Sequence, residues 1–591
     1  MAEKISGAEA LIQGLLAENV DRIFGYPGGY IIPVFDRLYD YTDRLTNVLT
    51  RHEQGAMHAA QGYARTSHKP GVVIVTSGPA ATNLITGLSD AMMDSTPLVV
   101  ITGQAPSEML GTDAFQETDV IGITSPVTKW SCQIRHAADV APTLARAFHI
   151  ASTGRPGPVV LDFTKDAQIE LTDPGYRRCR YIRSYVAKPE VNVYDIKHLA
   201  DMINRAKRPL ILAGQGVTIA EAEDELRTLA EKADIPVAAT LLGLSALPSG
   251  HPLFKGMLGM HGNFGPNINT NRADLIIAVG MRFDDRVTGT LEDYAPQARI
   301  AHVDIDASEF NKNVHVDLAV HADAREALQM LIPYINKAAH TEWSRSFDRH
   351  NAAEKRLVMQ EAAYGTDPDE PATMGEVSRL VSEAAGRGAI LVTDVGQNQM
   401  LSARYFRFTA PRSIITSGGL GTMGFGLPAA IGAKMGAPER GVYLFTGDGG
   451  IQMTVQELGT IMQYGTPVKI VILNNNFLGN VRQWQSLFFH DRFSQTRMLN
   501  PDFRMLAASY GIECIDVAVR GELAPAVKKL VESEKAMILN VNIREDDMVF
   551  PMTPVGKAVD YIMINPTDIY KPEGWTGTKD FTPYRFSPKT M

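Results

Sequence analysis

The chain has 591 residues, of which 45% are hydrophobic and 21% are charged, and its formal net charge is −9. A chain of this length forms several domains rather than one core, and its acidic balance argues against nucleic acid as the main partner. It contains no apolar run long enough to cross a membrane and no N-terminal signal or transit pattern, so we expect no membrane association and a cytoplasmic location. Its three scattered cysteines fit neither a disulfide framework nor a zinc site.

A first α/β unit is predicted over residues 1–170. Ser6-Gly7-Ala8-Glu9 has the form of a helix capping box, and patterns typical of buried strands follow it. The first of these strands ends in Pro27-Gly28-Gly29, a loop where backbone can approach a ligand. Glu53 follows a short apolar stretch. Taken alone it reads as a solvated carboxylate, and its context favours a catalytic role.

A second α/β unit is predicted over residues 190–340, after a polar linker. Gly214 and Gly216 form a Gly-x-Gly pattern behind an apolar run, which is a weak dinucleotide signal without a third glycine. A later apolar run ends at Gly280. Another ends in acids that include Asp304, which could accept ribose hydroxyls or could simply close a strand at the surface. A second, charged linker is predicted from about 337 to 373.

The third unit, predicted over residues 372–565, contains the strongest chemical pattern in the chain. Gly447-Asp448-Gly449 follows one apolar run and Asn474-Asn475 follows the next. Both polar groups are therefore expected beyond the carboxyl ends of buried parallel strands, where open sheets bind ligands. Gly-Asp-Gly alone is more often a turn, but a carboxylate and an amide spaced in this way suit Mg²⁺ with phosphate and water as further ligands. The tail, 566–591, has no periodicity and receives no function.

The three units together predict an α/β protein with three doubly wound parallel-sheet domains. The spaced pair in the third unit resembles the thiamin diphosphate-binding motif. Most of the chain, from about residue 6 to 557, is similar to the catalytic large subunits of the acetohydroxyacid synthase (acetolactate synthase) family, in the pyruvate oxidase/decarboxylase group. Eight ordered motifs underlie the resemblance: Tyr26-Pro27-Gly28-Gly29, Arg51-His52-Glu53, Asp113-Ala114-Phe115-Gln116-Glu117, Arg155-Pro156-Gly157-Pro158, Leu258-Gly259-Met260-His261-Gly262, Arg282-Phe283-Asp284-Asp285-Arg286, Gly421-Thr422-Met423-Gly424 and Gln483-Trp484-Gln485.

The resemblance implies a biosynthetic enzyme that decarboxylates pyruvate on thiamin diphosphate. It would transfer the hydroxyethyl carbanion to a second pyruvate or to 2-ketobutyrate, the first common step of valine, leucine and isoleucine biosynthesis. Glu53 would activate the cofactor through its pyrimidine ring, Met423 would support its bent shape, and the Gly421 carbonyl would orient its amino group. Mg²⁺ would be held by Asp448, Asn475 and the carbonyl of Phe477. The other implied thiamin diphosphate contacts are Gln397, Asn398, Gly447 and Gly449.

The resemblance also implies a pocket for the second keto acid and a flavin site. Arg286 would hold the carboxylate with its planar fork, and Trp484 would pack against the extra methyl group of 2-ketobutyrate. Gly29, Phe115, Gln116 and Lys165 complete the implied catalytic set. FAD would be structural, with no redox step. Its implied contacts are Arg155, Gly214, Gly216, Thr240, Leu241, Met260, His261, Gly280, Arg282, Asp304, Ile305 and Asp323.

Members of this family have active sites between subunits, so the resemblance implies a homodimer or tetramer in which Glu53 of one chain faces the Asp448 motif of another. A small regulatory subunit is the expected partner. Three positions depart from the family pattern. Tyr30 replaces a small residue and predicts a narrower channel, Asn398 replaces a histidine but can still donate a hydrogen bond, and Leu401 replaces a tryptophan.

Three other functions remain as alternatives. Pyruvate oxidase shares the fold, FAD and the catalytic glutamate, and the motifs around Arg286 and Trp484 argue against it. Glyoxylate carboligase lacks the catalytic glutamate that is present here as Glu53. A non-catalytic regulator on the same fold is disfavoured because Glu53, Asp448 and Asn475 are all intact.

Overall fold

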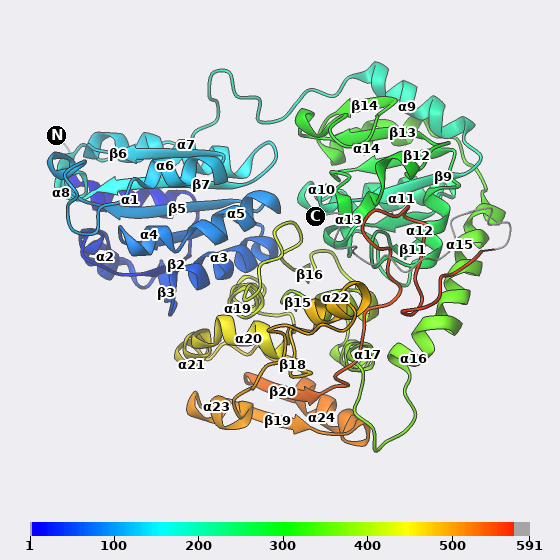
Figure 1. Cartoon of the computed structure of the whole chain (residues 1–591). Coiled ribbons are helices and arrows are strands. Elements are labelled where there is room, and N and C mark those ends of the chain that lie inside the picture. Colours follow the sequence, from blue (N-terminus) through cyan, green and yellow to red (C-terminus); the bar gives the residue numbers. More distant parts are fainter. Residues whose placement is uncertain (1–2, 573–591) are drawn as a thin grey trace.

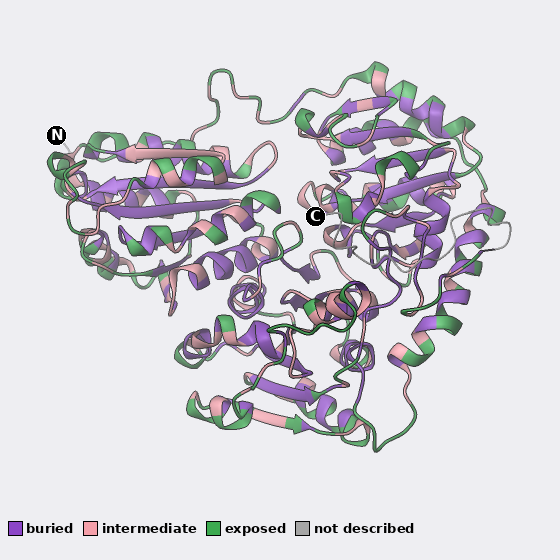
Figure 2. Ribbon diagram, in the orientation of Figure 1, coloured by how far each residue is buried: buried purple, intermediate pink, exposed green. Residues whose placement is uncertain are grey.

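In the computed structural model, which describes residues 3–572, three open parallel sheets of six strands each are flanked by helices. Figure 1 shows the N-terminal unit at the left, the central unit at the right and the C-terminal unit below them. Most strands form the buried interior of each unit, as the purple ribbons of Figure 2 show, while the edge strands β6 (Trp130–Ile134) and β19 (Glu513–Val517) are only partly buried. The predicted α/β class with three parallel sheets is confirmed.

The N-terminal sheet has the strand order β3-β2-β4-β5-β7-β6. Because β2 and β4 are neighbours and the chain leaves them in opposite directions, a switch point lies between their carboxyl ends. Ser6 caps the first helix and accepts a hydrogen bond from the Glu9 N–H at 3.1 Å, which is half of the predicted capping box; the Glu9 carboxylate accepts from Gln13 and Tyr41 rather than from the Ser6 N–H. The strands are β2 (Arg22–Tyr26), β3 (Thr46–Leu49), β4 (Gly71–Val75), β5 (Leu98–Gln104), β6 (Trp130–Ile134) and β7 (Pro158–Thr164). The helices are α1 (Gly7–Ala17), α2 (Ile32–Leu38), α3 (Glu53–Ser67), α4 (Pro79–Thr82), α5 (Ile85–Met93), α6 (Val120–Thr124), α7 (Val140–Ser152) and α8 (Lys165–Ile169).

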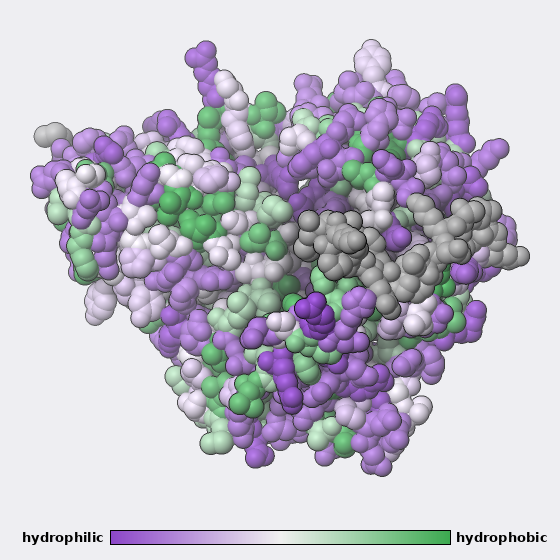
Figure 3. All heavy atoms as spheres, viewed as in Figure 1, coloured by the Kyte–Doolittle hydropathy of each residue, from purple (hydrophilic) through white to green (hydrophobic). Residues whose placement is uncertain are grey.

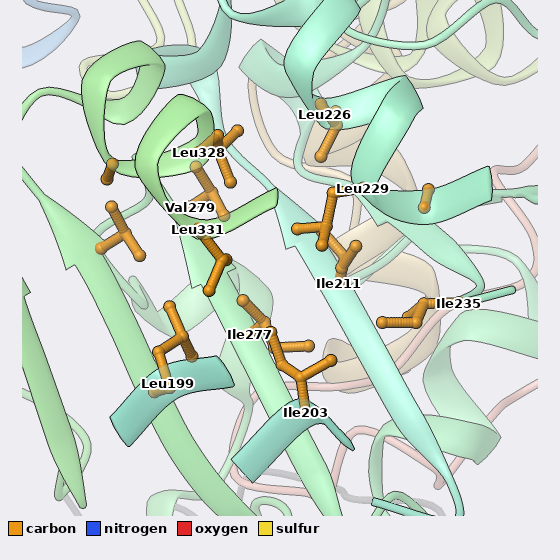
Figure 4. Close-up of a cluster of buried hydrophobic side chains, with 14 of the residues drawn as sticks. Leu199, Ile203, Ile211, Leu226, Leu229, Ile235, Ile277, Val279, Leu328 and Leu331 are labelled. Atoms are coloured by element: carbon orange, nitrogen blue, oxygen red, sulfur yellow. The ribbon is translucent and has the colours of Figure 1, made fainter. Parts of the chain in front are cut away.

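The central sheet has the order β11-β10-β9-β12-β13-β14, the order of dinucleotide-binding sheets. Figure 4 shows its core, in which apolar side chains of α9, α11 and α14 pack on β9 and β12. The strands are β9 (Pro209–Ala213), β10 (Val237–Ala239), β11 (Phe254–Met257), β12 (Leu275–Val279), β13 (Arg299–Asp304) and β14 (Leu318–His321). The helices are α9 (Val193–Arg205), α10 (Gln215–Ile219), α11 (Glu223–Ala233), α12 (Phe264–Thr270), α13 (Asp285–Thr288) and α14 (Ala324–Leu331).

The C-terminal sheet has the order β16-β15-β17-β18-β20-β19, so its switch point lies between β15 and β17. After β20 the chain returns to the central unit, where the Thr553 N–H donates to the Met260 carbonyl. The strands are β15 (Ile390–Thr393), β16 (Ile414–Ile415), β17 (Val442–Gly447), β18 (Lys469–Asn474), β19 (Glu513–Val517) and β20 (Met537–Asn542). The helices are α17 (Met374–Ala385), α18 (Gln397–Tyr405), α19 (Gly426–Gly436), α20 (Asp448–Met453), α21 (Leu458–Tyr464), α22 (Gly479–Phe489), α23 (Phe503–Ser509) and α24 (Arg520–Glu532).

The charged segment between the second and third sheets, interpreted from the sequence as a linker, is largely helical. It contains α15 (Thr341–Glu354) and α16 (Gln360–Ala363). Trp343, Phe347 and His350 are spaced by three or four residues and lie buried on one face of α15. The many charges on the other face obscured this stripe in the sequence. Most of the predicted tail, 573–591, lies outside the described residues.

Two helices with small side chains join the N-terminal and C-terminal units. A methyl group at Gly62 of α3 would lie 2.0 Å from the Ala429 carbonyl oxygen, and one at Gly432 of α19 would lie 1.7 Å from the Ala59 carbonyl oxygen. Only glycine allows the two backbones to approach so closely. Within residues 3–572, we found no helix with the length and apolar character of a membrane span.

Candidate active site

The third unit presents a small cleft at the switch point of its sheet. Every thiamin diphosphate and metal candidate predicted there lines this cleft except Gly421: Gln397, Asn398, Met423, Gly447, Asp448, Gly449, Asn475 and Phe477. Gln397 follows β15 and Asp448 follows β17, so the doubly wound topology itself brings the two together. At about 60 Å³ the cleft holds one end of a cofactor, since sites for whole ligands are several times larger.

The side-chain oxygen atoms of Asp448 and Asn475 line this cleft, an arrangement that suits a hydrated cation. Asp448 is 1% exposed, and its burial raises the pKa of the carboxyl group. A cation would favour the ionised carboxylate. Asn500 donates from Nδ2 to Asp448 Oδ2 at 2.8 Å and to Asn474 Oδ1 at 3.0 Å, which orients both groups. No group of three or more His, Cys, Asp or Glu side chains within residues 3–572 could hold a metal, so a metal here needs phosphate or water ligands as well.

The side-chain amides of Gln397 and Asn398 are held in place by hydrogen bonds within the protein. Gln397 Nε2 donates to Gln483 Oε1 at 3.0 Å and to the Asp547 carbonyl at 2.9 Å. Asn398 Nδ2 donates to the Val395 carbonyl, while its buried Oδ1 has no hydrogen-bond partner among the described residues. A buried polar atom without a partner is a place where a bound group or its water completes the site. The cleft therefore fits the diphosphate end of the implied cofactor together with Mg²⁺.

A much larger cavity of about 820 Å³ lies at the switch point of the central sheet, between β9 and β12. This volume is within the range of small-molecule and cofactor sites. Gly214 is the one implied FAD residue that does not line the cavity. A methyl group at this position would lie 2.1 Å from the Gly280 carbonyl oxygen. All the other implied FAD residues line the cavity: Arg155, Gly216, Thr240, Leu241, Met260, His261, Gly280, Arg282, Asp304, Ile305 and Asp323.

Several polar and charged groups of the large cavity have partners within the protein. Arg155 pairs with Glu309 at 2.6 Å and Asp306 at 3.3 Å, which connects the first unit to the central one. Asp304 Oδ1 accepts a hydrogen bond from the Asp306 N–H at 2.9 Å. Burial lowers the pKa of His261 to about 3, so the imidazole is neutral at physiological pH. The cavity wall thus combines close-packed glycines with an acid at the end of β13, which fits a dinucleotide such as FAD.

Two residues implied in substrate selection also line the large cavity. Arg286 lies in the short helix α13, and its side chain is 59% exposed. Its closest acid is Asp285, at 3.7 Å, so the guanidinium fork is open to a carboxylate. Trp484 lies in α22 with its ring centroid 5.0 Å from that of Phe488. Gly421 also lines this cavity.

The remaining candidates lie in the N-terminal unit and line neither the cleft nor the cavity. Glu53 begins α3, and its Oε2 accepts a hydrogen bond from Asn83 Nδ2 at 2.9 Å. Lys165 directly follows strand β7 and begins α8, with Nζ 5.7 Å from the Tyr30 ring centroid. Gly29 follows β2, Phe115 is 79% exposed, and Gln116 has a φ of 59°. Within one chain the candidates therefore form three groups, and Glu53 does not reach the cleft of Asp448.

Sequence reasoning missed several residues that organise these groups. Glu457, which precedes α21, accepts the Arg51 N–H at 3.0 Å beside Glu53. Asp394 directly follows the first strand of the third unit and accepts hydrogen bonds from the N–H groups of Gly424, in the loop that contains Met423, and of Gly426 at the start of α19. Its position at a strand end was a signal that could have found it. Asn500 gave no such signal, because it lies 52 residues from Asp448 in the sequence.

Comparison with known proteins agrees with the chemistry of the cleft. Three family models match the chain. They are the N-terminal TPP-binding domain of thiamine pyrophosphate enzymes over residues 5–123, their central domain over 196–331 and their C-terminal TPP-binding domain over 394–541. The chain belongs to the thiamine pyrophosphate enzymes.

Similar curated proteins narrow the family. The acetolactate synthase large subunit of Lactococcus lactis is 42% identical over 562 residues, covering 94% of this chain and 95% of that protein. The large subunit of acetolactate synthase isozyme 3 of Escherichia coli K12 is 39% identical over 578 residues, covering 96% and 100%. Within the thiamine pyrophosphate enzymes, the chain therefore belongs to the acetolactate synthase large subunits.

Proposed function

We propose that this chain is the catalytic subunit of a biosynthetic acetolactate synthase. It decarboxylates pyruvate and joins the remaining two-carbon unit to a second pyruvate or to 2-ketobutyrate, giving 2-acetolactate or 2-aceto-2-hydroxybutyrate. The observation that supports this most directly is the cleft at the β15–β17 switch point, where Asp448, Asn475 and Gln397 meet. The relatives named above carry the same activity in their names.

Different residues have different roles in this reaction. Bound thiamin diphosphate supplies an electron sink that allows a 2-keto acid to lose CO₂. Asp448 and Asn475 provide oxygen ligands for Mg²⁺, with the Phe477 carbonyl as the proposed third, and so anchor the phosphate end. Glu53 exchanges a proton through the carboxylate that Asn83 orients.

The acceptor keto acid is selected at the mouth of the large cavity. Arg286 presents its exposed guanidinium to the acceptor carboxylate, for which a planar fork is well matched. Trp484 offers an aromatic face to the alkyl group, and burial of one extra methyl group there favours 2-ketobutyrate over pyruvate by about 1–3 kcal/mol. Phe115, Gln116 and Lys165 approach from the N-terminal unit of another chain.

A second copy of the chain completes the site. Glu53 does not line the Asp448 cleft of its own chain, and the cleft holds only one end of the cofactor. Large apolar side chains are exposed on the units that would meet, among them Phe115 of the first unit and Leu420 and Leu499 of the third. Figure 3 shows hydrophobic surface on one face of both units. A homodimer is therefore the smallest active form that we propose, and a tetramer is compatible with it.

The other components follow the same proposal. The central cavity binds FAD without a redox step, and a small regulatory subunit is the expected protein partner. The working units are residues 1–170 for the pyrimidine end of thiamin diphosphate, 190–340 for FAD and 372–565 for the diphosphate and Mg²⁺. The cytoplasmic location expected from the sequence stays a prediction.

The first experiment measures acetolactate from pyruvate, thiamin diphosphate, Mg²⁺ and FAD, beside a Glu53→Gln variant. Acetolactate without net flavin reduction, with a sharp fall in the variant, supports the proposal. Glu342→Gln is the matched control, because Glu342 is exposed on α15 and lies outside both cavities. Acetate or peroxide in place of acetolactate would indicate a pyruvate oxidase instead.

Mixed dimers test the shared site. Glu53→Gln and Asp448→Asn chains are each inactive alone, but a dimer of one of each contains one site in which both residues are intact. Random pairing then restores about a quarter of wild-type activity, because half of the dimers are mixed and each has one working site. Sites formed within single chains would show no recovery at any mixing ratio.

A further inference from the structure

The cleft and the large cavity share part of their wall. Val395, Gly396 and Asn480 line both spaces. The loop from Ser417 to Phe425, which leads into α19, extends this wall, because residues 417–421 line the large cavity while Met423 lines the cleft. A displacement of this shared wall on the side of the large cavity therefore also displaces the wall of the cleft, since packed interiors transmit displacement.

One buried carboxylate ties the shared wall to the Met423 loop. Asp394 is 1% exposed and accepts hydrogen bonds from the N–H groups of Val395 at 2.8 Å, Gly424 at 3.0 Å and Gly426 at 3.0 Å. A methyl group at Gly450, two residues after Asp448, would lie 2.6 Å from Asp394 Oδ1. The same carboxylate therefore contacts the wall, the Met423 loop and the turn of the metal ligand.

The other end of the loop is held by two carboxylates of the N-terminal unit, that of Asp90 in α5 and that of Asp94 directly after it. Asp94 accepts the Gly418 N–H at 2.8 Å and the Gly419 N–H at 2.7 Å, and Arg65 pairs with it at 3.0 Å. Asp90 Oδ2 accepts the hydroxyls of Ser417 at 2.5 Å and Thr422 at 2.6 Å. With both ends fixed, the loop has little freedom except to move together with the wall.

We propose that Asp394 is a positioning residue that couples the two cofactor sites, so that FAD bound in the large cavity tightens the binding of thiamin diphosphate in the cleft. FAD packed against Val395–Gly396 and residues 417–421 fixes the wall, and through Asp394 it fixes Met423 in the position that the second cofactor needs. The coupling is reciprocal, because two linked binding equilibria must change by the same factor. This inference rests on the proposed function and gives a redox-silent flavin a physical role.

The test is a binding cycle on the full chain. The Kd of thiamin diphosphate with Mg²⁺ is measured by tryptophan fluorescence with and without saturating FAD, and the Kd of FAD is measured by flavin fluorescence with and without the other cofactor. We expect FAD to lower the Kd of thiamin diphosphate by about fivefold or more, within the range of typical coupled sites. A wild-type coupling factor of one overturns the inference.

The variant Asp394→Asn locates the coupling. Asparagine keeps one acceptor oxygen and replaces the other by a donor, so the N–H of either Val395 or Gly426 loses its acceptor and the coupling factor should fall towards one. A general loss of affinity cancels in this ratio, which separates positioning from damage. Asp274→Asn is the control, because the Asp274 carboxylate also accepts two main-chain N–H groups but lies outside both linings. A wild-type coupling factor in Asp394→Asn would refute the assigned role.

A second variant protects the test against misfolding of the first. Ser417→Ala removes the hydroxyl that donates a hydrogen bond to Asp90 at the far end of the loop. This variant should also lower the coupling factor. If it binds both cofactors with unchanged coupling, the loop is not the connection and the inference fails. Acetolactate formation by the wild type tests the proposed function separately, so an active enzyme with a coupling factor of one refutes only the coupling.

Discussion

A buried ion pair beside the large cavity provides a sharp test of how the central unit is supported. Glu354 of α15 and Arg404 of α18 form this pair, and both side chains are 1% exposed. Glu354 also accepts hydrogen bonds from Asn263 Nδ2 at 2.9 Å and the Phe264 N–H at 2.7 Å, while Arg404 donates to the His261 carbonyl. The pair therefore fixes the segment 261–264, which adjoins the cavity.

Replacement of Glu354 by Gln leaves the Arg404 charge buried without its counter-ion. Breaking a buried pair in this way costs about 3–5 kcal/mol. If the whole cost falls on the ordering of segment 261–264, FAD binding must restore that order. The Kd of FAD then rises by roughly 10²- to 4 × 10³-fold, at about 1.4 kcal/mol for each factor of ten. The melting temperature of the FAD-free chain should fall as well.

The assay combines flavin fluorescence titration with thermal melting of the FAD-free protein. Glu342→Gln on the same helix is the control. Its ion pair with Arg345 is exposed, with side chains 75% and 63% accessible, and such pairs contribute only about 0.2–1 kcal/mol. Replacing both Glu354 and Arg404 by Met should recover much of the melting temperature, because no buried charge remains. Equal FAD affinity and melting in the Glu354 and Glu342 variants would refute the reasoning.

Three further predictions concern the contact between the units and the substrate channel. Burial holds the pKa of His58 at about 3, so below pH 6.5 the unfolded chain takes up a proton that the folded chain does not. The free energy of unfolding, measured with urea, should therefore be lower by about 1.4 kcal/mol at pH 5.5 than at neutral pH. A His58→Gln variant should lack this part of the pH dependence. Gly432→Ala should lower thermal stability by about 1–3 kcal/mol, because its methyl group would overlap a carbonyl oxygen of α3, whereas Gly250→Ala, with nothing within 4 Å, should not. Tyr30→Ala should raise kcat/KM for bulkier 2-keto acid acceptors relative to pyruvate, because we expect the Tyr30 ring, which lies beside Lys165, to narrow the substrate channel. An unchanged ratio would contradict the predicted narrow channel.

The fold was predictable where strands are buried on both faces. Strands such as β4 and β9 are continuous apolar runs, and the parallel α/β class follows from their alternation with helices. The edge strand β6 escaped prediction because Trp130-Ser131-Cys132-Gln133-Ile134 is half-buried and has no such run. Helix α15 escaped because its solvent face is crowded with charge.

The candidate site was predictable only within each unit. Strand ends indicated Asp448 and Asn475 together, the family resemblance added Gln397, and these three residues do line one cleft. Local patterns could not show that Glu53 lies apart from them, because that depends on how separate units pack. Residues that act from a distance along the chain, such as Asn500, have no sequence pattern of their own. The roles assigned to these residues stay predictions until the variants are measured.

The contact between α3 and α19 suggests how two chains could pack to form the proposed shared active site. Each helix follows the second strand of its own unit, and the outer sheets have equivalent strand orders. Gly62 meets Ala429 just as Gly432 meets Ala59, so the two units face each other like the halves of a symmetric dimer enclosed in one polypeptide. A surface that already satisfies a twofold relation within the chain can be repeated between chains. Two copies would then form a ring of four related units, in which each unit has one neighbour from its own chain and one from the other.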